Sequence, residues 1–344
     1  MLHRLRQGVA GLRRLVGRRL LPGTVTGPYF GEAHYRRPHA LTRSLLGQPT
    51  ALAYRIYVPK HSSATGPLPL LIMLHGCRQD AEQFAAGTRM NRLAEREGFF
   101  VVYPEQSARR NALRCWSWFR HHTQEGDGEA TLISGLVIEL CESYAIDRQR
   151  IYVAGMSAGA AMARVLSLRC SWLLAACAMH SGLMYRAAND AVGAVSVMKR
   201  GSAVSADAIA SELAALPASQ CAQIPTLVIQ GADDETVNPV HLQQLSEQYR
   251  AIDAALLGQP SSSLVLSQSN GRRAGRLCQS STYTRGGLVL LRTVLIEGLG
   301  HAWSGGDSTY DFNDDIGPGA SRMIWDFVSR YRLGDGRVSR VIPR

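Results

Sequence analysis

The stretch IYVAGMSAG, residues 151–159, decides the fold, because an apolar β-type run leads directly into a Gly-x-Ser-x-Gly pentapeptide. A strand that ends in this pentapeptide and continues as a helix is typical of a nucleophile elbow. The glycines allow a turn so tight that the hydroxyl of Ser157 is held exposed in a strained conformation. A serine hydroxyl is a weak nucleophile by itself, so Ser157 requires a histidine base and an acid further along the chain.

Both groups follow in the chain order Ser, Asp, His, which is the order of the α/β-hydrolases. His301 stands in GLGHAWSGG after the last long β-type run, where a glycine-flanked loop can carry the imidazole to Ser157. The order and position favour this role over that of a loop histidine without function. The acid lies in QGADDETVNP. Asp233, Asp234 and Glu235 are adjacent there, and the residues alone do not decide among them.

An oxyanion hole requires backbone N–H groups aimed at the developing negative charge. One should be the amide of Ala158, directly after the nucleophile, and the other that of Cys77, since His-Gly-Cys at residues 75–77 is similar to the HGGG-type loop of esterases. His75 is then expected to be a structural residue. Aromatic side chains near the site should shape the acyl pocket, and we expect Trp303 and Trp116 to contact the substrate.

From about residue 51 the chain alternates β-type runs with helical patterns, which predicts a mostly parallel sheet flanked by helices on both faces. The expected strands are residues 53–59, 70–75, 99–103, 151–154, 175–180, 226–230 and 288–296. The expected helices are residues 81–96, 129–144, 158–169, 241–249 and 320–331. Residues 187–221 fit a lid or helices inserted between strands, and residues 258–285 fit a surface loop that could include a hairpin.

The 344 residues are 46% hydrophobic, with a net charge of +11 that is concentrated near the N-terminus. Residues 1–30 form a basic leader with six arginines, residues 31–335 the α/β domain, and residues 336–344 a tail. Residues 1–23 have helical apolar spacing, but arginines interrupt any apolar core of a secretory signal. We favour a solvated leader, because charge runs are usually solvated, over a helix that binds an anionic membrane or polymer granule.

The seven cysteines form no C-x-x-C pair and have no metal-ligand spacing with histidine, so no metal or other cofactor is expected. An odd number leaves at least one free thiol in the monomer. Nothing in the cysteine count decides the compartment.

The segments LPLLIMLHGCRQDAEQFAAGTRMNRLAEREGFFVVYPEQ, RCWSWF, GMSAGAAMA, HSGLMY, GADDETVNP and GHAWSGG strongly resemble the polyhydroxybutyrate (PHB) depolymerase family of esterases. The resemblance extends over residues 54–331 and implies an α/β-hydrolase fold. It places the nucleophile on Ser157, the histidine on His301 and, through the form G-x-x-D-x-x-V, the acid on Asp234. It also implies a disulfide between Cys77 and Cys115 that braces the oxyanion loop.

The activity implied is that of a serine carboxylic-ester hydrolase, which cleaves short-chain polyhydroxyalkanoate polymer or oligomer bonds of the 3-hydroxybutyrate type through an acyl-enzyme. A feruloyl or acetylxylan-type carbohydrate esterase shares the whole triad and is the main alternative. A granule- or membrane-binding module would explain the leader but not the triad, and a serine peptidase lacks support. The resemblance implies an extracellular enzyme, whereas the absence of a clear cleavable signal favours the cytoplasm. No nucleic-acid partner is expected.

Overall fold

The computed structural model describes residues 29–37, 50–60, 66–260 and 262–339. The expected helix of residues 1–23 therefore lies outside the described residues, and so does the end of the chain from residue 340. Within the described part, no helix is long and apolar enough to cross a membrane.

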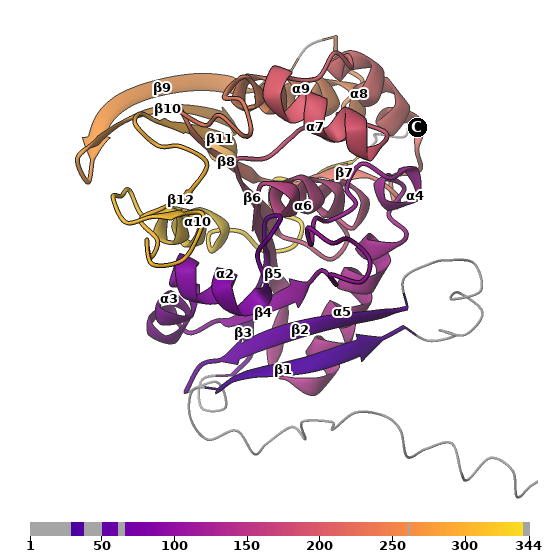
Figure 1. Ribbon diagram of the computed structural model, residues 1–344. Helices are drawn as coiled ribbons and strands as arrows, with labels where there is room; N and C mark the ends of the chain where they lie inside the picture. Colours follow the sequence, from indigo (N-terminus) through magenta and orange to yellow (C-terminus); the bar gives the residue numbers. More distant parts are fainter. Residues whose placement is uncertain (1–28, 38–49, 61–65, 261, 340–344) are drawn as a thin grey trace, which may run out of the picture.

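One ten-stranded sheet runs through the molecule (Figure 1). In sheet order the strands are β1 (Tyr29–Arg36), β2 (Ala51–Val58), β4 (Phe100–Glu105), β3 (Leu68–Leu74), β5 (Ile146–Met156), β6 (Ala176–His180), β8 (Thr226–Gly231), β11 (Leu288–Ile296), β10 (Arg276–Arg285) and β9 (Val265–Arg273). The inner strands from β4 to β11 are parallel. The outer pairs on both edges are antiparallel.

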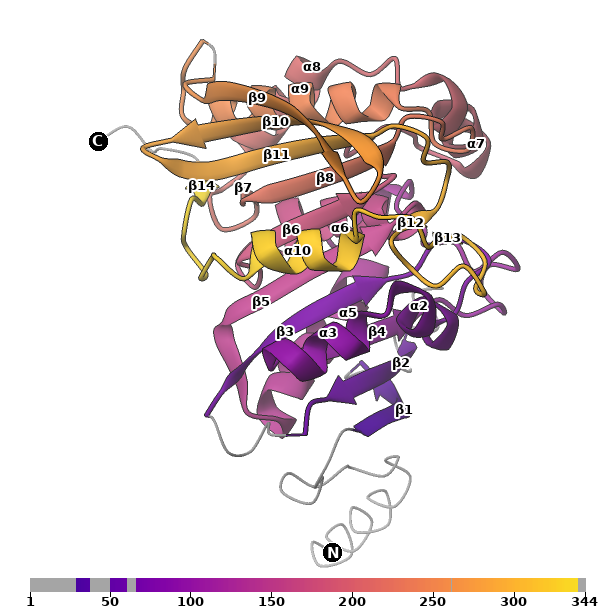
Figure 2. The same ribbon diagram turned by 90° about the vertical axis from the view of Figure 1, so that its left-hand side faces the viewer.

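Helices cover both faces of this sheet (Figure 2). One face carries α2 (Ala81–Thr88), α3 (Met90–Glu97) and α10 (Ala320–Val328). The other carries α5 (Glu129–Ser143), α6 (Ala158–Arg169) and α9 (Val240–Leu256), with α4 (His121–Gln124), α7 (Ala191–Arg200) and α8 (Ala206–Ala215) beside them. Two short pairs complete the fold: β7 (Ala222–Gln223) with β14 (Val338–Ser339), and β12 (Trp303–Ser304) with β13 (Asn313–Asp314).

The hydrophobic pattern explains this layering. Strands β3, β6 and β8 are buried along almost their whole length, as expected of parallel strands covered on both faces. Alternate strand residues contribute to two separate apolar clusters, one on each side of the sheet. The expectation of a mostly parallel sheet flanked by helices is confirmed.

The structure corrects several boundaries. The helix expected over residues 81–96 is two helices, because Arg89 between them adopts a left-handed conformation with φ 54°. Residues 258–285 do contain the hairpin that the sequence allows, β9–β10, but this hairpin extends the main sheet and is not part of a surface loop. Strand β1 begins at Tyr29, inside the segment assigned to the leader, and Val338–Ser339 of the expected tail pairs with β7. Such pairings join distant segments and leave no local signature.

Candidate active site

Ser157 occupies a sharp turn between strand β5 and helix α6. Its backbone has φ 56° and ψ −123°, a strained conformation for a residue with a side chain. A Cβ atom at Gly155 would collide with the backbone oxygen of Gly159, and one at Gly159 with that of Leu74. Only glycine therefore allows β5, β3 and α6 to approach this closely. The amide of Ser157 donates to the carbonyl of His180 at 2.9 Å, which ties the turn to the end of β6.

Asp234 and His301 meet at the carboxyl edge of the same sheet. Asp234 follows β8, and its carboxylate is completely buried, whereas Asp233 and Glu235 are exposed. Asp234 Oδ2 lies 2.8 Å from Nδ1 of His301. Since an ionised carboxylate only accepts hydrogen bonds, the histidine carries its proton on Nδ1 and leaves Nε2 as the basic nitrogen. Only Asp234 among the three adjacent acids can therefore orient this imidazole.

Converging donors hold the carboxylate of Asp234 in its ionised form. Its Oδ1 accepts from the amides of Thr236 at 2.9 Å and Val237 at 2.8 Å, and its Oδ2 accepts from the side chain of Gln230 at 3.1 Å. Burial alone raises the pKa of Asp234, but hydrogen bonds from His301, Val237 and Ser181 and the attraction of His301 outweigh it, so the pKa lies below its usual value.

Among the hydrogen bonds of the described residues, none joins His301 to the hydroxyl of Ser157. Such bonds are often long before substrate binds and tighten in the complex. The His301 side chain is 11% exposed. Its ring packs edge-to-face against the ring of Phe312, with the two ring centroids 6.4 Å apart. This contact limits the rotation of the imidazole. Ser157, Asp234 and His301 therefore all lie in the turns that follow the carboxyl ends of parallel strands of one sheet.

The oxyanion loop, residues 75–79, lies beside Ser157. A Cβ at Gly76 would be 3.5 Å from that of Ser157. In this loop the amide of Gly76 donates to the side chain of Gln79 and that of Arg78 to the carbonyl of Leu113. The amide between them, that of Cys77, has no partner among the described residues, and neither has that of Ala158 in the first turn of α6. These two free donors are the groups expected to hold an oxyanion.

Residues 113–116 hold the oxyanion loop in place through covalent and hydrogen-bond contacts. A disulfide joins Cys77 to Cys115, 38 residues apart. Trp116 Nε1 donates to the carbonyl of His75 at 3.1 Å. His75 is fully buried, with Nδ1 2.7 Å from the carbonyl of Gly76 and Nε2 accepting from the amide of Gln106 at 3.1 Å. Burial lowers the pKa of His75 to about 4, so this histidine is a neutral structural residue.

The expected substrate contacts of the two tryptophans need correction. Trp116 is 0% exposed and Trp303 1% exposed, so neither presents surface to an acyl group. Trp116 supports the oxyanion loop instead, and the ring of Trp303 stacks on His180 with centroids 5.3 Å apart. Large aromatic rings bury more apolar area than any other side chain, which favours such interior positions.

Sequence reasoning missed three polar residues of the site: Gln230, His180 and Ser181. All three lie at the carboxyl ends of β6 and β8 or directly after them. The signal that could have found them is a polar pair directly after a buried strand, since the ends of parallel strands meet at one edge.

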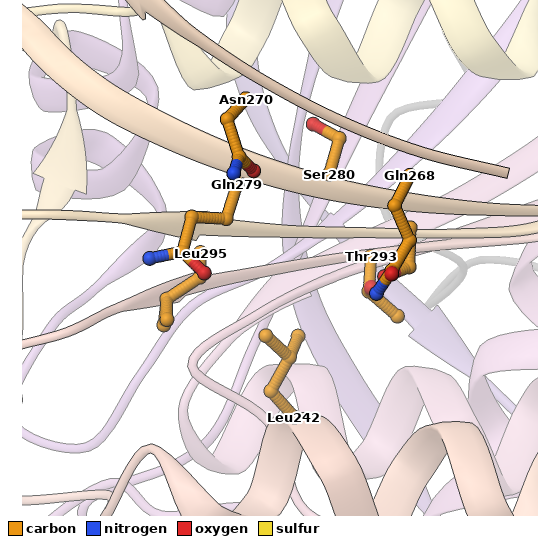
Figure 3. A pocket seen from close by; sticks show the side chains of 8 residues that line it. Leu242, Gln268, Asn270, Gln279, Ser280, Thr293 and Leu295 are labelled. Atoms are coloured by element: carbon orange, nitrogen blue, oxygen red, sulfur yellow. The ribbon is translucent and has the colours of Figure 1, made fainter.

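A cavity of about 310 Å³ lies between the start of α9 and the inner face of the β9–β10 hairpin (Figure 3). Its walls are mainly uncharged amide and hydroxyl side chains. They are Leu242, Gln268, Asn270, Gln279, Ser280, Ser281, Thr293 and Leu295. In the chain, β11 precedes the loop that carries His301, and α9 follows the loop that carries Asp234.

The parallel sheet, the serine turn after β5, the acid after β8 and the histidine after β11 together define an α/β-hydrolase fold. A solved acetyl xylan esterase from Aspergillus awamori has this fold with a TM-score of 0.62, at 20% identity, over 80% of this chain and 93% of that one. The chain belongs to the family described as Esterase PHB depolymerase, whose model matches residues 52–259. That match includes Ser157 and Asp234 and ends before His301.

Two curated relatives are similar over part of their length. A poly(3-hydroxyalkanoate) depolymerase C from Paucimonas lemoignei is 34% identical over 42% of this chain and 34% of its own. An acetylxylan esterase A from Talaromyces purpureogenus is 27% identical over 61% of this chain and 56% of its own. The chain thus spans between about a third and just over half of the length of these relatives.

Proposed function

We propose that the protein is a serine esterase whose nucleophile, base and acid are Ser157, His301 and Asp234. His301 Nε2 takes the hydroxyl proton as Ser157 attacks the ester carbonyl, and the amides of Cys77 and Ala158 hold the resulting oxyanion. The alcohol leaves with that proton. Water, activated by the same imidazole, then releases the acid from the acyl-enzyme, so the cycle requires no cofactor.

The single observation that carries this proposal is the Asp234–His301 hydrogen bond of 2.8 Å at the edge where Ser157 stands strained. Strained backbone conformations such as φ 56° with ψ −123° cluster at active sites, where they are part of the mechanism. Family membership and the names of both relatives agree with ester hydrolysis.

We assign short-chain polyhydroxyalkanoate esters of the 3-hydroxybutyrate type as the substrate class, by similarity to the depolymerase relative. A second candidate is an acetylxylan-type carbohydrate ester. The amide- and hydroxyl-lined cavity of the hairpin favours it, since such uncharged groups suit the hydroxyls of a polysaccharide. The Cys77–Cys115 disulfide favours an oxidising, extracellular location, because disulfides persist mainly there.

A substrate panel tests the activity and its class. Wild-type protein should hydrolyse p-nitrophenyl butyrate, and Ser157→Ala should reduce kcat by about 10⁵-fold or more. Ser167→Ala, at a buried serine of α6 whose hydroxyl donates to the carbonyl of Arg164, is the matched control and should keep its activity. Undiminished turnover by Ser157→Ala would refute the proposal.

Rates on 3-hydroxybutyrate oligomers, acetylated xylan and methyl ferulate then separate the candidates. If the carbohydrate ester is the substrate, Gln268→Ala with Asn270→Ala should lower the rate on acetylated xylan but not on p-nitrophenyl acetate. Ser269→Ala, on the opposite face of the same strand, is the control. Preference for the oligomers, with no effect of the cavity variants, would support the depolymerase class.

A further inference from the structure

His180 and Ser181 connect the two halves of the candidate triad. Strand β6 lies between β5, which leads to Ser157, and β8, which leads to Asp234. At the end of β6 the carbonyl of His180 accepts from the amide of Ser157, and the amide of Ser181 donates to the carbonyl of Ile229 in β8, each at 2.9 Å. The backbone of this dipeptide therefore spans from the nucleophile to the strand of the acid.

The side chains of the same dipeptide lie next to the acid. His180 Nδ1 lies 3.1 Å from Ser181 Oγ, and hydrogen bonding from the Ser181 side chain is one of the causes that lower the pKa of Asp234. Both residues are 0% exposed. Ser181 has φ 51°, so its backbone is held in a left-handed conformation that costs free energy for a residue with a side chain.

The direction of the hydrogen bonds follows from the chemistry of each group. Ionised Asp234 can only accept, so the hydroxyl of Ser181 donates to it. That hydroxyl has one proton, so its oxygen accepts from Nδ1 of His180. His180 therefore carries its proton on Nδ1. Its Nε2 is then the unprotonated nitrogen, and it is buried without a hydrogen-bond partner in the described part of the chain.

The charge state of His180 agrees with this arrangement. Burial lowers its pKa to about 3, and the nearby His301 lowers it further than Asp234 raises it. His180 is thus neutral at neutral pH, and it places no second positive charge beside the imidazole that has to become protonated during the reaction.

We propose that His180 and Ser181 are positioning residues for ester hydrolysis, in a chain of hydrogen bonds from His180 through Ser181 and Asp234 to His301. This role rests on the proposed esterase function. The chain fixes the carboxylate of Asp234 so that its Oδ2 faces His301 Nδ1, and His180 determines which way the Ser181 proton points. Neither residue touches the substrate.

Ser181→Ala removes the donor to Asp234 and is expected to reduce kcat about tenfold with KM unchanged, because the lost bond orients the base and does not bind substrate. Ser167→Ala, the same change at another buried serine, should alter neither constant. A Ser181→Ala enzyme with wild-type kcat would overturn the proposal, as would a change confined to KM.

The His180 variants separate hydrogen bonding from packing. His180→Asn and His180→Leu both lose the ring stacked on Trp303, but only asparagine can place an N–H near the former Nδ1. We expect His180→Asn to retain at least about threefold more kcat than His180→Leu. Equal losses in the two variants would show that His180 serves packing alone.

A measurement without substrate keeps this proposal distinct from the esterase function. The proton shared by His301 Nδ1 and Asp234 Oδ2 should give a separate downfield proton NMR signal. Ser181→Ala should displace that signal and Ser167→Ala should not. A displaced signal in a protein that hydrolyses no ester would uphold the hydrogen-bond chain and refute the function, and an unmoved signal would refute the chain.

Discussion

The oxyanion loop and the acid–base pair are held by different forces. On the oxyanion side, a disulfide, an indole N–H and a backbone bond join residues 75–79 to the segment around Cys115. On the acid–base side, no covalent link is involved, and hydrogen bonds from several elements converge on Asp234. Covalent bracing suits a loop that must keep backbone amides still, whereas an ionised buried carboxylate is stabilised only by donors.

The largest effect should come from the acid–base side. Asp234→Asn removes the charge and reverses the preferred tautomer of His301, so kcat should fall by about 10⁴-fold. Asp233→Asn changes the exposed neighbour and should leave kcat within about twofold of wild type. Steady-state kinetics on a p-nitrophenyl ester measures both, and a larger loss in Asp233→Asn would mean that the acid has been misassigned.

On the oxyanion side, we expect loss of the disulfide to lower the stability of the protein more than its activity. Removing the disulfide with Cys77→Ala and Cys115→Ala opens a loop of 38 residues, which should lower the free energy of unfolding by about 3–4 kcal/mol. Activity at 25 °C should fall much less, because Trp116 and the Arg78–Leu113 bond still hold the loop.

Urea unfolding of the double variant tests this difference. Cys141→Ala, at a free cysteine of intermediate exposure, is the matched control. A double variant as stable as the control would remove the distinction between a covalently braced half and a hydrogen-bonded half.

Low pH should lower the free energy of unfolding through His75 on the oxyanion side and His180 on the acid–base side. We expect this effect to be smaller than that of removing the disulfide. The folded-state pKa values of His75 and His180 are lowered to about 4 and about 3, while the unfolded chain titrates near 6.5. Between these values the unfolded state binds more protons, so the free energy of unfolding falls as pH decreases below about 6.5. The slope is at most about 1.4 kcal/mol per pH unit for each histidine.

Urea unfolding at pH 7 and pH 5 measures that slope. His180→Asn should reduce this slope by the contribution of one histidine, at most about 1.4 kcal/mol per pH unit. A slope unaffected by His180→Asn would mean that this imidazole is not held neutral by burial.

The nucleophile side of the site could be predicted from the sequence by itself, because its geometry is local. Gly155, Ser157 and Gly159 are neighbours, and the turn they form is dictated by which residues lack a side chain. The alternation of β-type runs and helical patterns likewise indicated the parallel sheet and most of its helices, since buried strands and amphipathic helices each have their own period.

Only the tertiary structure decided what surrounds that nucleophile. The residue pattern left three adjacent acids open, the family resemblance indicated Asp234, and burial beside His301 gives the physical reason for that choice. The sequence predicted that Trp116 and Trp303 contact the substrate, but in the folded protein both side chains are buried in the interior. His180 and Ser181 gain their roles because β6 lies between β5 and β8, and strand order depends on contacts between residues far apart in the chain, which no local pattern records.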